Sequence, residues 1–167
     1  MARPAPLDPE RLFVTLASHG VEYVLIGALA ARLRGFPRLT AAADIAPSKE
    51  GDNLERLAAA LRELDARIYT ESVPEGLPFD FDARTLAGGR IWNLVTSAGR
   101  LDLAFVPAGT GGYPDLVEGA VRFEVYGVTL PAASLRDILR SKEAADRPKD
   151  RQDALLIRAM LEREEAD

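Results

Sequence analysis

Two aspartates on separate predicted strands are the side chains best suited to chemistry in this sequence. Asp44 interrupts the apolar run 41–46, and Asp102 lies between Leu101 and Leu103. Burying a carboxylate in such a run is costly unless a cation or several hydrogen-bond donors satisfy it. On neighbouring strands the two acids could share one face and a Mg²⁺ ion, which prefers carboxylate and phosphate oxygens. The alternative is that both acids lie on edge strands and face water.

A glycine between a predicted strand and a predicted helix is the second feature with chemical potential. Gly27 follows the apolar run 22–26 and precedes the helical pattern at 28–34. Because glycine has no side-chain carbon, backbone amides at this turn could approach a phosphate. A glycine at such a turn can equally serve packing alone, and both interpretations stay open.

The residue types exclude several other kinds of active site. The chain has no cysteine, which excludes a disulfide scaffold, a thiolate zinc site and a cysteine nucleophile, and we expect a cytoplasmic protein. His19 is the only histidine, so a Ser–His–Asp triad could be built only around it. Its place in the last turn of a predicted helix favours a capping or surface role.

Length and composition predict one globular domain. The 167 residues are 47% hydrophobic and 28% charged, and we expect a core at about 20–130 and a C-terminal helical part at about 132–165. The net charge of −5 argues against a protein that coats nucleic acid. No run resembles a signal peptide or a membrane span, so we expect neither secretion nor membrane insertion.

Basic residues concentrate in the last third of the chain. They form either a solvated helix face or an electrostatic funnel for an anionic ligand. These residues are Arg136, Arg140, Lys142, Arg147, Lys149 and Arg151.

Hydrophobic periodicity and turn residues predict an α+β layout. Asp8 and Pro9 predict the start of the first helix, and Ser134 predicts the start of a later one. We expect Tyr69 and Trp92 to be core residues. The predicted helices are 9–19, 28–34, about 52–64, 83–86, 113–119, a helix from 134, and a final helix after an interruption at 147–150. The predicted strands are 22–26, 39–46, 67–70, 91–96, 100–106 and the hairpin 121–126 with 128–131.

In combination, several segments carry a family resemblance. Residues 23–30 and 35–40, followed by the acid-bearing strand, resemble the minimal nucleotidyltransferases of the DNA polymerase β superfamily. The chain is most similar to the AbiEii-like group, whose members include toxins of type IV toxin–antitoxin pairs. Segments 99–103, 107–113 and 141–150 are similar to that group as well, so the resemblance covers roughly residues 22–154.

The resemblance implies a mixed β-sheet flanked by helices and metal-assisted transfer of a nucleotide from an NTP. It implies that Asp44, Asp102 and Lys142 are catalytic and that the two aspartates bind Mg²⁺ or Mn²⁺. The remaining implied contacts are to the nucleotide and its phosphates: Gly27 and Ala28 at the phosphate turn, Lys142 and Asp150 in the C-terminal motif, and Arg38 and Thr40, which could otherwise merely end a turn.

One departure from the family pattern bears on activity. The pattern places a first metal-binding aspartate at position 42, where this chain has Ala42. Positions 42 and 44 project from one face of a strand, so a metal ligand is missing and turnover is expected to fall by orders of magnitude. Ala28 also stands where many relatives carry serine.

Two functions therefore stay open. The first is a nucleotidyltransferase that modifies a hydroxyl of RNA, tRNA in particular, or of a protein, as the toxin of a toxin–antitoxin pair. The second is a catalytically dead module of the same fold that binds nucleotide, RNA or an antitoxin.

Overall fold

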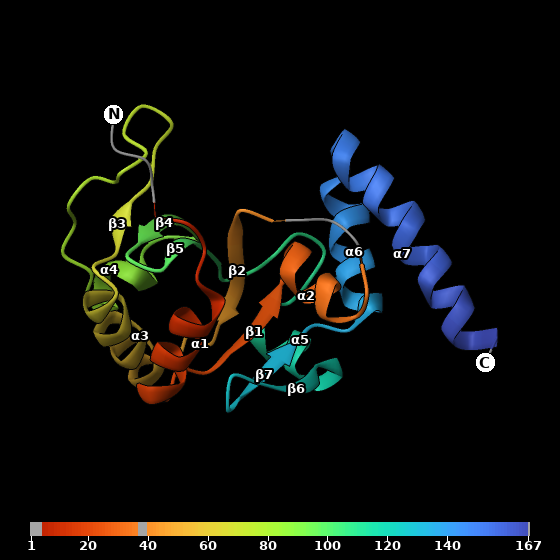
Figure 1. Cartoon of the computed structure of the whole chain (residues 1–167), viewed down its shortest axis with the longest axis horizontal. Helices are drawn as coiled ribbons and strands as arrows, with labels where there is room; N and C mark the ends of the chain where they lie inside the picture. Colours follow the sequence, from red (N-terminus) through yellow and green to blue (C-terminus); the bar gives the residue numbers. More distant parts are fainter. Residues whose placement is uncertain (1–4, 37–39, 167) are drawn as a thin grey trace.

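The computed structural model describes residues 5–36 and 40–166 and contains a mixed β-sheet flanked by helices (Figure 1). Seven strands form the sheet within these residues. The strands are β1 Tyr23–Ile26, β2 Ala42–Pro47, β3 Arg67–Ile68, β4 Ile91–Thr96, β5 Gly99–Ala104, β6 Val121–Val125 and β7 Val128–Ala132.

The order of strands across the sheet is β3-β4-β5-β2-β1-β7-β6. The pairs β2 with β5 and β1 with β7 are parallel, and the other neighbours are antiparallel. The sheet is therefore mixed, as predicted. Its centre holds β5, β2 and β1; β1 and β2 are consecutive strands, whereas β5 comes from a distant part of the chain.

Helices lie on both sides of this sheet (Figure 1). In Figure 1, α1 and α3 lie toward one end of the molecule, whereas α6 and α7 pack together at the other. The helices are α1 Pro9–Ser18, α2 Gly27–Leu33, α3 Gly51–Glu63, α4 Ala83–Ala87, α5 Tyr113–Gly119, α6 Leu135–Ala145 and α7 Pro148–Ala166. This arrangement confirms the predicted α+β class with C-terminal helices.

The two central strands β2 and β5 separate a buried face from a half-buried one. Ala43, Ile45, Leu101 and Leu103 are fully buried in the main apolar cluster. The residues between them along each strand are only half-buried, because successive side chains point to opposite faces. The half-buried face carries both Asp44 and Asp102, so the apolar alternation itself turns the acids away from the core.

Local signals in the sequence correctly located several helix ends and one turn. Asp8 caps α1 by accepting the backbone N–H of Arg11 at 3.1 Å, and Ser134 caps α6 by accepting that of Asp137 at 3.1 Å. His19 is the C-cap of α1 and lies 3.2 Å from Glu63, which confirms its capping and surface role.

The turn of the predicted hairpin also has the expected chemistry. Tyr126 and Gly127 both have positive φ, as a tight two-residue turn between antiparallel strands requires.

The boundaries of some predicted elements were wrong. The second strand begins at Ala42, so residues 40 and 41 of the predicted strand 39–46 precede it, and position 39 lies outside the described residues. β3 stops at Ile68 rather than 70, and β5 stops at Ala104 rather than 106. At the start of β2, the Thr40 hydroxyl donates to the Ala42 carbonyl at 2.7 Å, so this residue forms a local turn.

The interruption predicted at 147–150 is shorter than expected. Asp146 ends α6 in the left-handed conformation, and α7 already begins at Pro148. Proline suits the first helical position, and Asp150 accepts the backbone N–H of Arg147 at 3.2 Å, which caps the new helix. Lys149 and Asp150 thus belong to the first turn of α7.

No helix within the described residues is both long and apolar enough to cross a membrane.

Candidate active site

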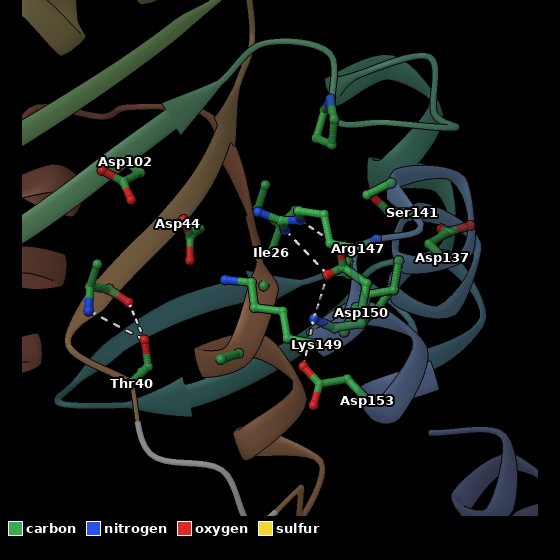
Figure 2. A pocket seen from close by; sticks show the side chains of 18 of the residues that line it. Ile26, Thr40, Asp44, Asp102, Asp137, Ser141, Arg147, Lys149, Asp150 and Asp153 are labelled. Carbon is green, nitrogen blue, oxygen red and sulfur yellow. Dashed lines mark hydrogen bonds and ion pairs between the residues drawn. The ribbon is translucent and has the colours of Figure 1, made fainter. Parts of the chain in front are cut away.

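A cavity of about 530 Å³ lies between the half-buried face of the sheet and helices α6 and α7 (Figure 2). Arg38 lies outside the described residues. All the other predicted site positions line the cavity: Gly27, Ala28, Thr40, Ala42, Asp44, Asp102, Lys142 and Asp150.

Asp44 and Asp102 are directly paired in the parallel register of β2 and β5. Paired residues of neighbouring strands project from the same face, so both carboxylates line the cavity floor (Figure 2). Burial, and secondarily the charge of Asp102, raises the pKa of Asp44 to about 7. Burial also raises the pKa of Asp102, although Arg100 opposes that shift. The sequence-based expectation that these two acids share one face holds.

Gly27 lies directly against the Asp44 carboxylate. Its φ is +70°, and a Cβ atom at this position would lie 2.7 Å from Oδ2 of Asp44. Both the left-handed backbone and this close approach require glycine. The first residue of α2 therefore has a packing reason to be glycine, namely its contact with the Asp44 carboxylate.

The wall opposite the sheet is built from basic side chains held by acids. Lys142 of α6 lies 3.1 Å from Asp153 and 3.8 Å from Asp150. Arg147 makes two hydrogen bonds to Asp150, at 2.5 and 3.2 Å. Lys149 also lines the cavity. Its positive charge opposes the rise in the pKa of Asp44 without cancelling it.

Asp150 lines the cavity at this wall and organises the cations around it. Its side chain is only 1% exposed. Burial alone would raise the pKa of Asp150, but hydrogen bonds from Arg147 and the charge of Lys142 hold it below its ordinary value. In this arrangement Asp150 orients two cations toward the cavity, and a direct contact of Asp150 with nucleotide stays a prediction.

Arg100 is a residue of the cavity floor that the sequence analysis did not single out. Its Nη2 donates to Oδ1 of Asp102 at 2.8 Å, and its Cζ lies 3.8 Å from the centre of the Tyr69 ring. Tyr69, predicted as a core residue, is instead half-buried against this guanidinium. The spacing of Arg100 and Asp102 on one strand already placed them on one face, which is the signal that could have revealed the pair.

The carboxylates fit one divalent cation better than two. Aspartate oxygens are suitable ligands for Mg²⁺. Burial and the neighbouring Asp102 carboxylate both disfavour the ionised form of Asp44, so its negative charge is not fully compensated by the cations around it. Within the described part of the chain, no group of three His, Cys, Asp or Glu side chains could hold a metal ion. A cation at this pair would therefore complete its shell with water or ligand oxygens.

Comparison by sequence found no matching family model and no matching curated protein. Among the solved structures that match this chain are two nucleotidyltransferase folds. A putative nucleotidyltransferase, TM1012 from Thermotoga maritima, has a TM-score of 0.52 and 15% identity, over 95% of this chain and 97% of that chain. The lincosamide antibiotic adenylyltransferase LnuA, in its lincomycin-bound form, has a TM-score of 0.59 and 16% identity, over 93% and 99%. The fold of this chain is therefore that of a nucleotidyltransferase.

Proposed function

We propose that the chain is a metal-dependent nucleotidyltransferase that binds an NTP in the cavity and transfers a nucleotide to a hydroxyl group at a low rate. The observation that carries this proposal is the direct pairing of Asp44 with Asp102 on the cavity floor. The nucleotidyltransferase folds of TM1012 and LnuA support it.

The two walls of the cavity have the charges that this reaction needs. A triphosphate is strongly anionic, and Lys142, Arg147 and Lys149 line the wall opposite the carboxylates. Cations fixed by Asp150 and Asp153 can hold phosphate oxygens without reorganisation at the moment of reaction. Arginine suits phosphate because its planar fork donates two hydrogen bonds, whereas lysine acts as a point charge.

Asp44 and Asp102 would hold a Mg²⁺ or Mn²⁺ ion, which, when bound, neutralises phosphate charge and polarises the phosphorus centre. Gly27 keeps the turn before α2 close to Asp44 and free of side-chain atoms. Phosphate can approach the backbone of this turn only while position 27 has no Cβ atom.

Ala42 limits the rate in this proposal. It lines the cavity two residues before Asp44 but supplies no ligand. Positioning of the NTP by the basic wall is retained, whereas stabilisation of the transition-state charge is reduced.

The test has a binding arm and a transfer arm. Calorimetry with a non-hydrolysable NTP and Mg²⁺ is expected to give one binding event, which Asp44→Asn weakens. Incubation with NTPs labelled at the α-phosphate and total RNA is expected to give slow labelling that Asp44→Asn and Asp102→Asn abolish. Absence of NTP binding with and without Mg²⁺ would reject the proposal.

A second function, nucleotide binding without transfer, is favoured by one observation. The described residues offer two carboxylates where the family pattern has three. NTP binding that depends on Asp44, with no label transferred after prolonged incubation to any acceptor, would select this function.

The acceptor is proposed to be a hydroxyl of RNA, with tRNA as the first substrate to test. Because LnuA is an adenylyltransferase of lincosamide antibiotics, lincomycin and a protein extract are the comparison acceptors. A toxin role and an antitoxin partner stay predictions. Growth arrest on expression of the wild type, but not of Asp44→Asn, would support the toxin role.

A further inference from the structure

Arg100 lies beside Ala42 on the neighbouring strand. The parallel register of β2 and β5 pairs Ala42 with Arg100, just as it pairs Asp44 with Asp102. Side chains at alternate positions of a strand share a face. The floor of the cavity therefore combines a pair of carboxylates with an adjacent pair made of a small apolar residue and a cation.

Two contacts hold the Arg100 guanidinium in place. Its Nη2 lies 2.8 Å from Oδ1 of Asp102, and the ring of Tyr69 stacks on it at 3.8 Å. The side chain is 24% exposed, and Nε is buried with no hydrogen-bond partner among the described residues. A guanidinium has five N–H donors in a rigid fork, so Asp102 engages only part of this capacity.

This guanidinium changes the charge that the carboxylate pair presents. Ionised Asp44 and Asp102 carry two negative charges. Arg100, which is hydrogen-bonded to Asp102, compensates one of them. A divalent ion at the pair would share Asp102 with a cation that is already attached. Like charges a few ångströms apart repel strongly in a partly buried site. The pair with Arg100 therefore attracts less additional positive charge than the pair alone.

A carboxylate at position 42 would pair with Arg100 before it could bind a metal ion. Opposite charges in direct cross-strand register are close enough to interact, and Arg100 has unused donors. Alanine at this position leaves the guanidinium committed to Asp102.

We propose that Arg100 is a resident cation that takes the electrostatic place of a second divalent ion, with Ala42 as the small residue matched to it. This inference rests on the proposed function and deepens it, because it limits the site to one bound divalent ion. Arg100 acts through Asp102 and is therefore a positioning residue. The competing interpretation is an ion pair that only keeps Asp102 and Tyr69 in place.

Titration with Mn²⁺ alone, without nucleotide and at pH 8, separates the two interpretations. The electron paramagnetic resonance signal of free Mn²⁺ reports binding to the full chain. Arg100→Gln is expected to raise the Mn²⁺ affinity about tenfold, because it removes a unit charge beside Asp102. Arg100→Lys keeps the charge and is expected to stay within about twofold of the wild type, because the charge sets the Mn²⁺ affinity.

The matched control is Arg122→Gln on β6, an edge strand of the sheet. This substitution is expected to leave the Mn²⁺ affinity unchanged. Thermal melting confirms that each variant folds. If folded Arg100→Gln binds Mn²⁺ no more tightly than the wild type, or if Arg100→Lys behaves like Arg100→Gln, the resident-cation role is rejected.

Variants at position 42 test the matching of Ala42 to Arg100. Ala42→Asp alone is expected to bind one Mn²⁺ ion per chain, because the new carboxylate pairs with Arg100. The double variant Ala42→Asp/Arg100→Gln is expected to bind two. A second Mn²⁺ ion in Ala42→Asp alone would overturn the proposal.

The result for Arg100 is distinguishable from the result for the proposed function. Tighter Mn²⁺ binding in Arg100→Gln, with no NTP bound by any variant, would support the resident cation and reject the transferase. Nucleotide transfer by the wild type, with Mn²⁺ affinity unaffected by Arg100→Gln, would do the reverse.

Discussion

Asp44 on the sheet and Asp150 on α7 line the same cavity, yet their surroundings shift their pKa values in opposite directions. Burial beside Asp102 raises the pKa of Asp44 to about 7. Hydrogen bonds from Arg147 and the charge of Lys142 hold the pKa of the more deeply buried Asp150 below its ordinary value. The depth of burial therefore does not decide the direction of the shift; the partners do.

This difference separates two roles for one residue type. The carboxylates of the helical wall already have cations bound and fix where those cations lie. The carboxylates of the sheet have only Arg100, which pairs with Asp102 and leaves Asp44 without a bonded cation among the described residues. The cavity floor is therefore the side where a carboxylate is available to an incoming cation.

The largest expected effect is that of Asp44→Asn on the rate of nucleotide transfer. The rate should fall about a thousandfold, equivalent to about 4 kcal/mol, because the amide cannot replace the carboxylate charge. Initial rates with labelled NTP measure the loss. Asp65→Asn, at an exposed position next to β3, removes the same charge outside the cavity. Equal losses in the two variants would contradict a specific role for Asp44.

Asp150→Asn is expected to lower the free energy of unfolding by about 2 to 3 kcal/mol at pH 7, because a buried acid is removed from its cations. The depressed pKa of Asp150 stabilises the fold above the unfolded pKa. That stabilisation is lost as the pH falls through the folded pKa. Urea unfolding at neutral pH and near pH 3 measures both regimes.

Asp146→Asn is the control for this destabilisation. The carboxylate of Asp146 is 61% exposed and pairs with Arg151 on the surface. Its loss should change stability far less than the loss of the buried Asp150, because an exposed ion pair is screened by solvent. A comparable destabilisation by the two substitutions would show that the wall does not depend on the buried pair.

Asp44→Asn is expected to act on stability in the opposite sense. Between an ordinary pKa of 3.8 and a folded pKa of about 7, the folded chain binds more protons than the unfolded chain. Wild-type stability therefore falls as the pH rises through this window, and the amide removes that loss. We expect a gain of about 2 kcal/mol at pH 8 after discounting for solvent screening.

Two measurements check the sign of this effect. The gain should vanish below the unfolded pKa of Asp44, as seen by urea unfolding across the pH range. Saturating Mg²⁺ should stabilise the wild type more than Asp44→Asn, because the ion binds the folded state through this acid. A stability gain that is the same at all pH values would contradict the assignment to ionisation of Asp44.

The smallest expected effect is that of Lys149→Gln on NTP binding. Lys149 lies in the first turn of α7 and faces the cavity from the exposed end of the basic wall. Loss of one exposed point charge should weaken binding about fivefold, or about 1 kcal/mol, and less at high salt. Calorimetry with a non-hydrolysable NTP measures this. Lys49→Gln, which lies over the Phe105 ring outside the cavity, should have no effect.

Much of the local architecture could be predicted because its causes lie within a few residues. The Asp8 cap, the left-handed turn at Gly127 and the alternation around Asp102 are each encoded by neighbouring side chains. That Asp44 and Asp102 each face away from the core was also predictable, since an acid in an apolar strand is turned away from it, whereas the pairing of their strands was not.

The wrong or missing predictions have two causes, one a local contact that was overlooked and the other a contact between distant parts of the chain. The start of α7 at Pro148 depends on Asp150 reaching the backbone of Arg147, so a segment interpreted as a break became a capped helix. Tyr69 appeared to be a core residue because its partner, the Arg100 guanidinium, comes from a strand further along the chain.

The sequence by itself determined which strands have an acid on their half-buried face and that position 42 lacks one. These properties depend on residue type and two-residue alternation, which need no distant contact. Only the tertiary structure decided that β2 lies parallel to β5 in the register that sets Arg100 beside Ala42, and that the start of α7 brings Arg147 and Lys149 to the cavity of Asp44. Those placements depend on burial of apolar faces from separate parts of the chain, and residues far apart in sequence acquire a common electrostatic environment only when that burial brings them together.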